Sequence, residues 1–434
     1  MIKILSNATI VQFDPARVQS GVDIALEHGR IVKIGKNLTI SSPGAAILPM
    51  DGKLVLPGMV CAHNHFYSAL ARGITADIAP STDFVSILNN LWWRLDRAID
   101  EEILEASALA AALEAVKAGT TAVIDHHASP NFITGSLDVL KNAFEKIGLR
   151  GILCYETTDR NGETGMKEGI AENINFAKGI DVKNDRRLVE AAIGGHAPFT
   201  LNDKALEMMK EAIDETGRGI HVHVSEDAYD AAFSHHQKRE DPLARLNRFG
   251  LLNKNALIIH GVHLTETEIG LLNEHDSYLV HNPRSNMNNN VGYMEKIQQV
   301  KNIAIGTDGI GSDMFEEFKF AFFKHRDAGG ALWPDTFARF LQNGNHILEH
   351  YFGGKFGTVK AGYRADFTIL DYNSPTPLTA DNVAGHLAFG MSARDVDSVM
   401  VNGKFIYKNR EFPFDTAKIY ASARKAAAKL WKNM

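Results

Sequence analysis

The sequence is poor in cysteine and has no large excess of charge of either sign. Cys61 and Cys154 are its only cysteines in 434 residues, too few for a disulfide framework or a cluster of thiolate metal ligands. Lysine and arginine together number 46, against 52 aspartates and glutamates, which gives a formal net charge of −6. This balance argues against a nucleic-acid-binding protein and gives no sign of a basic surface for a membrane.

Long hydrophobic runs are missing as well. No apolar stretch reaches the length of a transmembrane helix, and the first five residues resemble a strand instead of the basic and apolar parts of a signal peptide. Hydrophobic residues still make up 45% of the chain, enough for a large core. We therefore expect a cytoplasmic enzyme with a small-molecule substrate and neither nucleic acid nor membrane as a partner, and we allow for a homodimer.

Both ends of the chain are rich in short β-like pieces. They fill residues 1–57 and return after residue 355, where Asn402-Gly403 between two apolar runs predicts a hairpin. An Ala/Lys-rich segment at 415–432 predicts a final helix. We expect residues 1–57 and 355–434 to form one small domain, a β-sandwich with a C-terminal helix.

The middle of the chain, residues 58–354, alternates strand and helix patterns. Eight such strands predict an α/β fold of the (β/α)8 or TIM-barrel type, in which catalytic groups lie at the C-terminal ends of the strands. Each of the eight strand candidates ends near an ionisable residue. These residues are His63, Asp125, Glu156, His196, His223, His260, His281 and Asp308.

Two histidines at the end of the first barrel strand indicate a metal site. His63 and His65 are separated by one residue, so on an extended chain they point the same way and can converge on one ion. Later strand ends add further imidazoles and a carboxylate, a donor set that suits a divalent ion of the zinc or iron type. The alternative is that the two histidines are ordinary polar residues in a loop.

These motifs together resemble a known family. Pro57-Gly58 leads to His63-Asn64-His65; His223 is followed by Glu226; His260 and Asp308 end later strands. The loops at 195–200 and 282–286, and the segment at 361–366, fit the same pattern. The chain resembles the amidohydrolase superfamily in its one-metal aminohydrolase branch, which includes relatives of cytosine, guanine and adenosine deaminase.

The resemblance implies a ligand set and roles. His63, His65, His223 and Asp308 would bind one divalent ion, with Zn²⁺ favoured and Fe²⁺ considered. His196 rather than a lysine ends the fourth strand, so a carbamylated lysine between two metals is not expected. Asp308 would also orient the attacking hydroxide, and His260 would hydrogen-bond the water or the tetrahedral oxygen. Glu226 would protonate a ring nitrogen and pass a proton to the leaving amine.

The resulting hypothesis is an aminohydrolase that deaminates a small nitrogen heterocycle, of purine or pterin type, by attack of a metal-bound hydroxide. Ring opening of a cyclic amide by the same site is one alternative, and a barrel that binds a metal or metabolite without turnover is another. Five further residues are interpreted as substrate contacts, against structural roles in loops or core: His196, Arg284, His126, Glu156 and Trp93.

Overall fold

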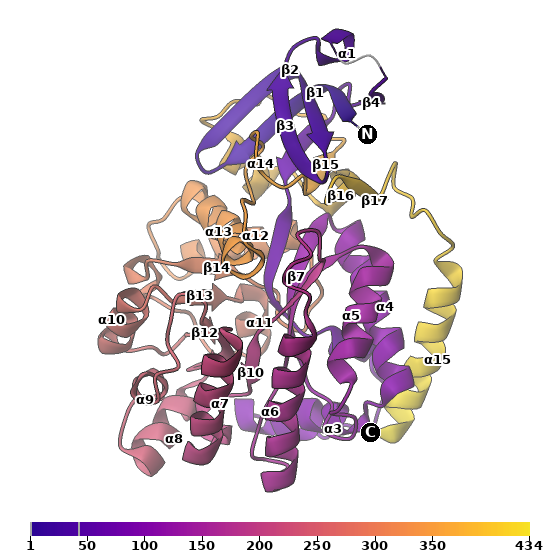
Figure 1. Cartoon of the computed structure of the whole chain (residues 1–434). Coiled ribbons are helices and arrows are strands. Elements are labelled where there is room, and N and C mark those ends of the chain that lie inside the picture. Colours follow the sequence, from indigo (N-terminus) through magenta and orange to yellow (C-terminus); the bar gives the residue numbers. More distant parts are fainter. Residues whose placement is uncertain (1, 42–43) are drawn as a thin grey trace.

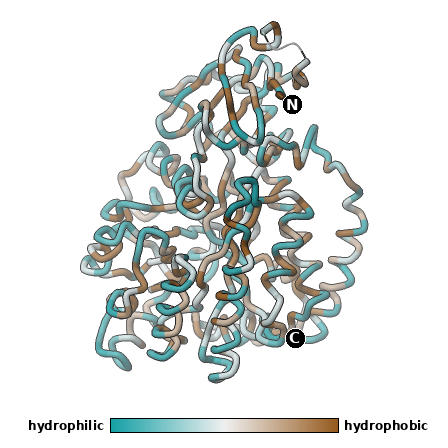
Figure 2. Tube along the Cα trace, viewed as in Figure 1, coloured by the Kyte–Doolittle hydropathy of each residue, from teal (hydrophilic) through white to brown (hydrophobic). Residues whose placement is uncertain are grey.

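The computed structural model describes residues 2–41 and 44–434. Figure 1 shows a small β-rich domain above a larger part in which helices surround a set of strands, with the final helix, α15, along the side of the larger part. The hydrophobic segments lie mostly inside, and hydrophilic residues follow the outer helix turns and loops (Figure 2). Among the described residues, no helix combines the length and apolar composition that a membrane crossing requires.

The small domain is built on one hydrogen-bonded sheet that joins the two ends of the chain. Its strand order is β17-β16-β15-β5-β1-β2-β3, and β4 also pairs with β1. β15 lies antiparallel to β5, with Phe367 opposite Pro57 and Leu370 opposite Leu54, which confirms that both ends build the domain. The strands are β1 (Lys3–Phe13), β2 (Ala16–Glu27), β3 (Arg30–Gly35), β4 (Ala46–Pro49), β5 (Leu54–Pro57), β15 (Phe367–Leu370), β16 (Val396–Val401) and β17 (Lys404–Tyr407).

The predicted hairpin forms between β16 and β17. Its two turn residues, Asn402 and Gly403, have φ values of 48° and 68°. Positive φ at both central positions is what a two-residue hairpin turn needs, and asparagine and glycine tolerate it best.

The barrel strands pair in parallel in two runs, β6-β7-β8-β9 and β10-β11-β12-β13-β14. Parallel bridges from Thr157 to Gly195 and from Asn64 to Asp308 join the runs at both seams. Because only Ala192 separates β9 from β10, the two count as one barrel strand, and the predicted barrel of eight is present. The strands are β6 (Met59–Asn64), β7 (Thr120–His127), β8 (Arg150–Tyr155), β9 (Val189–Ala191), β10 (Ile193–Gly195), β11 (Ile220–Val224), β12 (Leu257–His260), β13 (Tyr278–His281) and β14 (Ile303–Ile305).

Helices cover the outside of the barrel. Each of the barrel strands is buried along its whole length, as in β7 and β8, because side chains on one face fill the barrel and those on the other contact the helices. Helix α5 shows the matching pattern: Leu137, Leu140, Phe144 and Ile147 are buried at spacings of three and four residues.

The bounds of the α-helices are α1 (Leu38–Ser41), α2 (Phe84–Ile87), α3 (Trp93–Ala98), α4 (Glu101–Lys117), α5 (Ser136–Ile147), α6 (Gly162–Gly179), α7 (Asp203–Thr216), α8 (Ala228–Lys238), α9 (Pro242–Arg248), α10 (Glu266–Glu274), α11 (Pro283–Asn288), α12 (Met314–Asp327), α13 (Pro334–Phe352), α14 (Val383–Phe389) and α15 (Ala417–Asn433). Short turns of other helix types are η1 (Phe66–Ala71), η2 (Leu88–Trp92), η3 (Pro198–Thr200), η4 (Ile297–Gln299) and η5 (Ala393–Asp395).

The C-terminal helix does not pack where the sequence suggested. We grouped it with the small domain, but α15 lies along α4 of the barrel (Figure 1). Lys117 Nζ donates to Tyr420 Oη at 2.6 Å, and Trp431 Nε1 donates to the carbonyl of Leu70 at 2.8 Å. The helix therefore supports η1, the segment that follows the first two histidines.

Arg150, at the start of β8, links the barrel to the small sheet. Its Nε and Nη2 both lie 2.9 Å from Asp366 Oδ2, and its Nη2 donates to Asn402 Oδ1 at 2.8 Å. The guanidinium also lies 4.9 Å from the centre of the Phe352 ring. Arg150 is 1% exposed and Asp366 7%, so neither charge has solvent to replace its partner.

Replacing Arg150 with methionine should therefore lower the free energy of unfolding by roughly 3–5 kcal/mol, because it leaves a buried carboxylate without its cation. Lys178→Ala is the control: its pair with Glu215 is about half exposed on both sides, and its loss should cost at most about 1 kcal/mol. Chemical denaturation measures both. Similar small losses in the two variants would contradict the linking role of Arg150.

Candidate active site and metal centre

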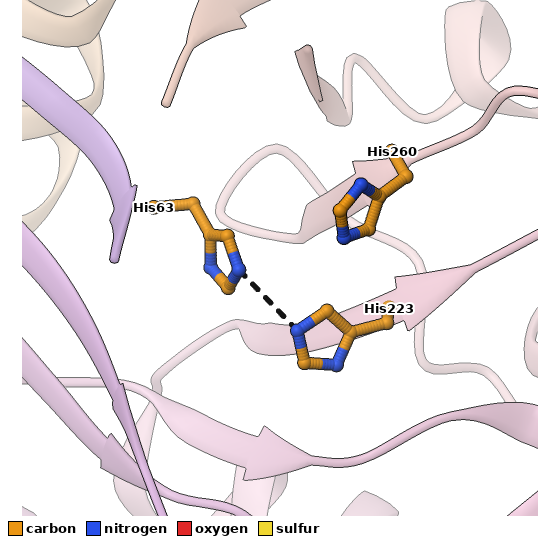
Figure 3. A group of neighbouring side chains, drawn as sticks. All are labelled: His63, His223 and His260. Carbon is orange, nitrogen blue, oxygen red and sulfur yellow. Dashed lines mark hydrogen bonds between the residues drawn. The ribbon is translucent and has the colours of Figure 1, made fainter. Parts of the chain in front are cut away.

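The predicted ligands meet at the C-terminal ends of the barrel strands. His63 Nε2 lies 3.3 Å from His223 Nε2, and Asp308 Oδ1 lies 3.0 Å from His65 Nε2 and 3.6 Å from His63 Nε2. Figure 3 shows the rings of His63, His223 and His260 turned toward a common space. Ligand atoms of His63, His65 and Asp308 all lie within 4.8 Å of one another, as do those of His63, His223 and His260.

The other ring nitrogen of each ligand histidine is engaged. His65 Nδ1 donates to the carbonyl of His126 at 2.6 Å, and His223 Nδ1 donates to the carbonyl of His196 at 2.8 Å. His63 Nδ1 lies 2.9 Å from Nε2 of a further buried histidine, His221. A proton on Nδ1 leaves the lone pair on Nε2, which is the form that binds a metal.

The donor set fits a divalent cation. Burial lowers the pKa of the His63 imidazole to about 3, against the pull of Asp308. Burial also opposes the charged forms of His65 and Asp308. The hydrogen bond and charge of Asp308 nevertheless raise the pKa of His65 to about 9, and hydrogen bonds with His63 and His65 hold the pKa of Asp308 well below its usual range. Imidazoles and an ionised carboxylate are the ligands that zinc and iron prefer, and a cation that binds here takes the place of the proton that His65 shares with Asp308.

The backbone is strained where these strands end. Ser225, His260 and Asp308 have φ values of 49°, 69° and 53°. Non-glycine residues rarely adopt this left-handed conformation, which costs about 1–3 kcal/mol at each position. The turns direct the side chains of His260 and Asp308 into the barrel mouth, so packing energy elsewhere in the fold offsets strain at the site.

Glu226 and His260 lie beside the ligands. His260 Nε2 is 3.4 Å from Glu226 Oε2 and 3.8 Å from Asp308 Oδ2. Burial, together with the negative charge of Asp308, raises the pKa of Glu226, although the charge of His260 opposes this. A raised pKa favours the protonated carboxyl group, which a proton donor requires. The structure thus brings together all six residues predicted as ligands or catalytic groups.

Three of the five expected substrate contacts line the cavity above this cluster. Trp93, Glu156 and His196 all face it. The His196 ring packs edge-on against Trp93 with ring centres 6.2 Å apart, and its Nδ1 lies 2.6 Å from Thr200 Oγ1. These three residues are in position to contact a substrate.

The structure does not bring the other two, His126 and Arg284, to the cavity. His126 is fully buried, and its Nε2 lies within 3.2 Å of the carbonyls of Gly195 and His221. The Arg284 guanidinium pairs with Glu316 and Glu317 on α12 and not with Glu156. Arg284 does not itself line the cavity, although its Nη2 donates to the backbone carbonyl of Ile310, which does. Because Glu316 and Glu317 lie in the first turn of α12, within reach of the long Arg284 side chain, the guanidinium pairs with them and does not turn into the cavity.

Some residues of the site were missed from the sequence. Asp96, Ser285 and Asn289 line the cavity, and Ser285 donates to Asp308 Oδ2. Arg160 Nη2 lies 2.8 Å from Glu156 Oε1 and 3.7 Å from Asp96 Oδ2. A short helix starting at Pro283 would have placed Ser285 and Asn289 on one face, but nothing in the sequence places Asp96 beside Glu156.

Comparison with known proteins identifies the family. A model described as "Amidohydrolase family" matches residues 54–406. The chain belongs to the amidohydrolase family. It is 31% identical over 414 residues to a 5-methylthioadenosine/S-adenosylhomocysteine deaminase of Thermococcus sibiricus, covering 93% of each chain. It is 27% identical over 430 residues to a 5'-deoxyadenosine deaminase of Methanococcus aeolicus, covering 95% of this chain and 96% of the relative.

Solved structures agree. An adenosine deaminase from Xanthomonas campestris with bound zinc superposes with a TM-score of 0.85 at 26% identity, over 99% of this chain and 98% of that one. Guanine deaminase from E. coli, at 19% identity and a TM-score of 0.79, covers 94% of this chain and 99% of its own and shares the fold. The protein is thus a hydrolase of carbon–nitrogen bonds other than peptide bonds, of the amidohydrolase and deaminase class.

The ligand geometry predicts about one divalent ion per chain, because a single group of three imidazoles and one carboxylate is a mononuclear catalytic set. Replacing His63 or His223 with alanine should abolish metal binding and activity. Elemental analysis of the purified protein tests this, with His235→Ala, a 60% exposed side chain on α8, as the control. Two ions per chain, or full occupancy in His63→Ala, would contradict the assignment.

Proposed function

We propose that the enzyme deaminates a 6-aminopurine nucleoside in a mononuclear site of His63, His65, His223 and Asp308, with Zn²⁺ as the favoured ion. The observation that carries the proposal is Glu226 next to this ligand set, since a proton-transferring carboxyl group is not needed for binding alone. The names of the relatives support it: those deaminases act on adenine nucleosides with altered 5' positions.

The side chains support the chemistry as follows. A divalent ion bound here would lower the pKa of a water molecule. The water oxygen forms a bond to the ring carbon that bears the amine, Glu226 protonates the adjacent ring nitrogen, and His260 hydrogen-bonds the oxygen as it gains charge. Asp308 accepts the water proton. Glu226, now ionised, takes up the proton that remains on the attacking oxygen and passes it to the amine. The exocyclic C–N bond breaks, ammonia leaves as the ring carbonyl forms, and the proton held by Asp308 returns to Glu226.

The cavity wall suits a purine with a polar substituent. Phe84, Trp92 and Phe199 provide apolar surface, on which an aromatic ring can stack. Asp96 is 3% exposed, and its Oδ1 has no hydrogen-bond partner among the described residues. An unpaired buried carboxylate oxygen costs free energy that a donor can recover, and a ribose hydroxyl is such a donor.

Glu226→Gln should retain the fold and the metal, because Glu226 is not a proposed ligand, and should reduce kcat by roughly 10²-fold or more, the usual effect of losing a general acid/base. Steady-state kinetics and metal analysis on the same preparation measure this. Asp227→Asn is the control, because it tests whether loss of any nearby acidic group has the same effect; the Asp227 carboxylate caps the following helix, α8. Asp230→Asn is less suitable, because the Asp230 carboxylate accepts a hydrogen bond from the backbone N–H of Ser225. A near-normal rate in Glu226→Gln would assign the proton to another group.

The decisive experiment is to incubate metal-loaded protein with a panel of aminopurine nucleosides, free aminopurines, pterins and cyclic amides. Deamination replaces an amino group with oxygen and frees one ammonia per turnover, whereas ring opening adds a whole water and frees none. Product mass and an ammonia assay separate the two. Turnover of a cyclic amide without ammonia would replace the proposed reaction with ring opening, and no turnover of any compound by metal-loaded protein would favour a binding role.

A further inference from the structure

The short helix α11 and the residue after it hold two side chains of the proposed catalytic group. Ser285 Oγ donates to Asp308 Oδ2, the carboxylate oxygen that is not near His65. Asn289 Nδ2 donates to Glu226 Oε1 at 3.1 Å. Each contact fixes one carboxylate oxygen and leaves the other free to face the site.

A third contact from the same helix reaches His260. His260 Nδ1 donates to Asn286 Oδ1 at 2.8 Å, so its Nε2 is the nitrogen turned to Glu226. Residues four apart lie on one face of a helix, which explains why Ser285 and Asn289 both point inward. The Asn289 N–H also donates to the Ser285 carbonyl at 2.8 Å, so Asn289 continues the helical turn.

Arg284 ties the outer side of this helix to its surroundings. Its backbone N–H donates to Glu317 Oε1 at 3.0 Å, its guanidinium pairs with Glu316 and Glu317, and its Nη2 donates to the carbonyl of Ile310 at 3.1 Å. Glu317 is fully buried, and Ile310 is two residues after Asp308. One side chain thus connects α11, α12 and the loop that carries a proposed ligand.

We propose that α11 is a positioning element for the reaction: Asn289 orients Glu226, Ser285 orients Asp308, and Arg284 anchors the helix. The inference rests on the proposed function for the roles of Glu226 and Asp308. Proton transfer needs heavy atoms within about 2.6–3.2 Å, and a misplacement of 1 Å can cost about 10²-fold in rate. A glutamate with several rotatable bonds keeps that distance only if one of its oxygens is held.

Asn289→Ala should lower kcat by about 10-fold, well within the cost of a misplaced group, while KM and metal content stay near the wild-type values. The sharper test is a double-mutant cycle. If Asn289 acts through Glu226, adding Asn289→Ala to Glu226→Gln should lower kcat no further, because the orienting contact has lost its function. Met287→Ala is the matched control, since that side chain lies on the same helix and is 43% exposed.

Three results would overturn the proposal: unchanged kcat in Asn289→Ala, an effect on KM alone, or full additivity with Glu226→Gln.

Arg284→Met combined with Glu317→Gln, which removes the buried charge together with its partner, tests the anchor. It should lower kcat with little change in KM, whereas a rise in KM alone would make Arg284 a substrate contact instead. Absence of deamination by the wild type refutes the proposed function separately. In that case a crystal structure of Asn289→Ala decides the positioning role: an unmoved Glu226 side chain refutes it and a displaced one supports it.

Discussion

The burial of several imidazoles and carboxylates at one end of the barrel is the constraint on which the rest of the site depends. His63, His223 and His260 are at most 8% exposed, so each ring nitrogen must find a partner inside the protein or lose the free energy of its hydration. The Nδ1 atoms find carbonyl and amide oxygens or a further histidine. The Nε2 atoms of the ligands are left facing one another and Asp308, an arrangement that a cation completes.

The two ends of the barrel place their buried polar groups differently. At the C-terminal strand ends, left-handed turns at His260 and Asp308 accept strain to direct side chains inward. At the N-terminal end, Arg150 begins its strand and is tied to Asp366 of the small sheet by a fully paired contact. The same division holds across barrels of this type, in which one face carries chemistry and the other stability.

The sequence predicts the strand ends well because their signal is local. An apolar run followed by His63 and His65 fixes both the strand and the direction of the two side chains, and the hairpin at Asn402-Gly403 is set by the turn residues. The contacts of long side chains are harder to predict from the sequence. The final partner of Arg284 depends on which carboxylate the next helix brings near, and the packing of the C-terminal helix on α4 depends on contacts between residues more than 300 apart in the chain.

The cavity wall holds two carboxyl groups, Glu156 and Asp96, that take no part in the proposed proton transfers. The pKa of Glu156 is held below its usual value, despite burial, by His196, His126 and Arg160. The pKa of Asp96 is instead raised to about 7, first by burial and then by the charge of Glu156. The guanidinium of Arg160, 2.8 Å from Glu156 Oε1 and 3.7 Å from Asp96 Oδ2, therefore compensates mainly the charge of Glu156. A substrate that donates to Asp96 would supply the missing partner, so the pairing of Asp96 is one way for the wall to discriminate between substrates, while the proposed ligands and Glu226 beneath it would perform the same reaction on each.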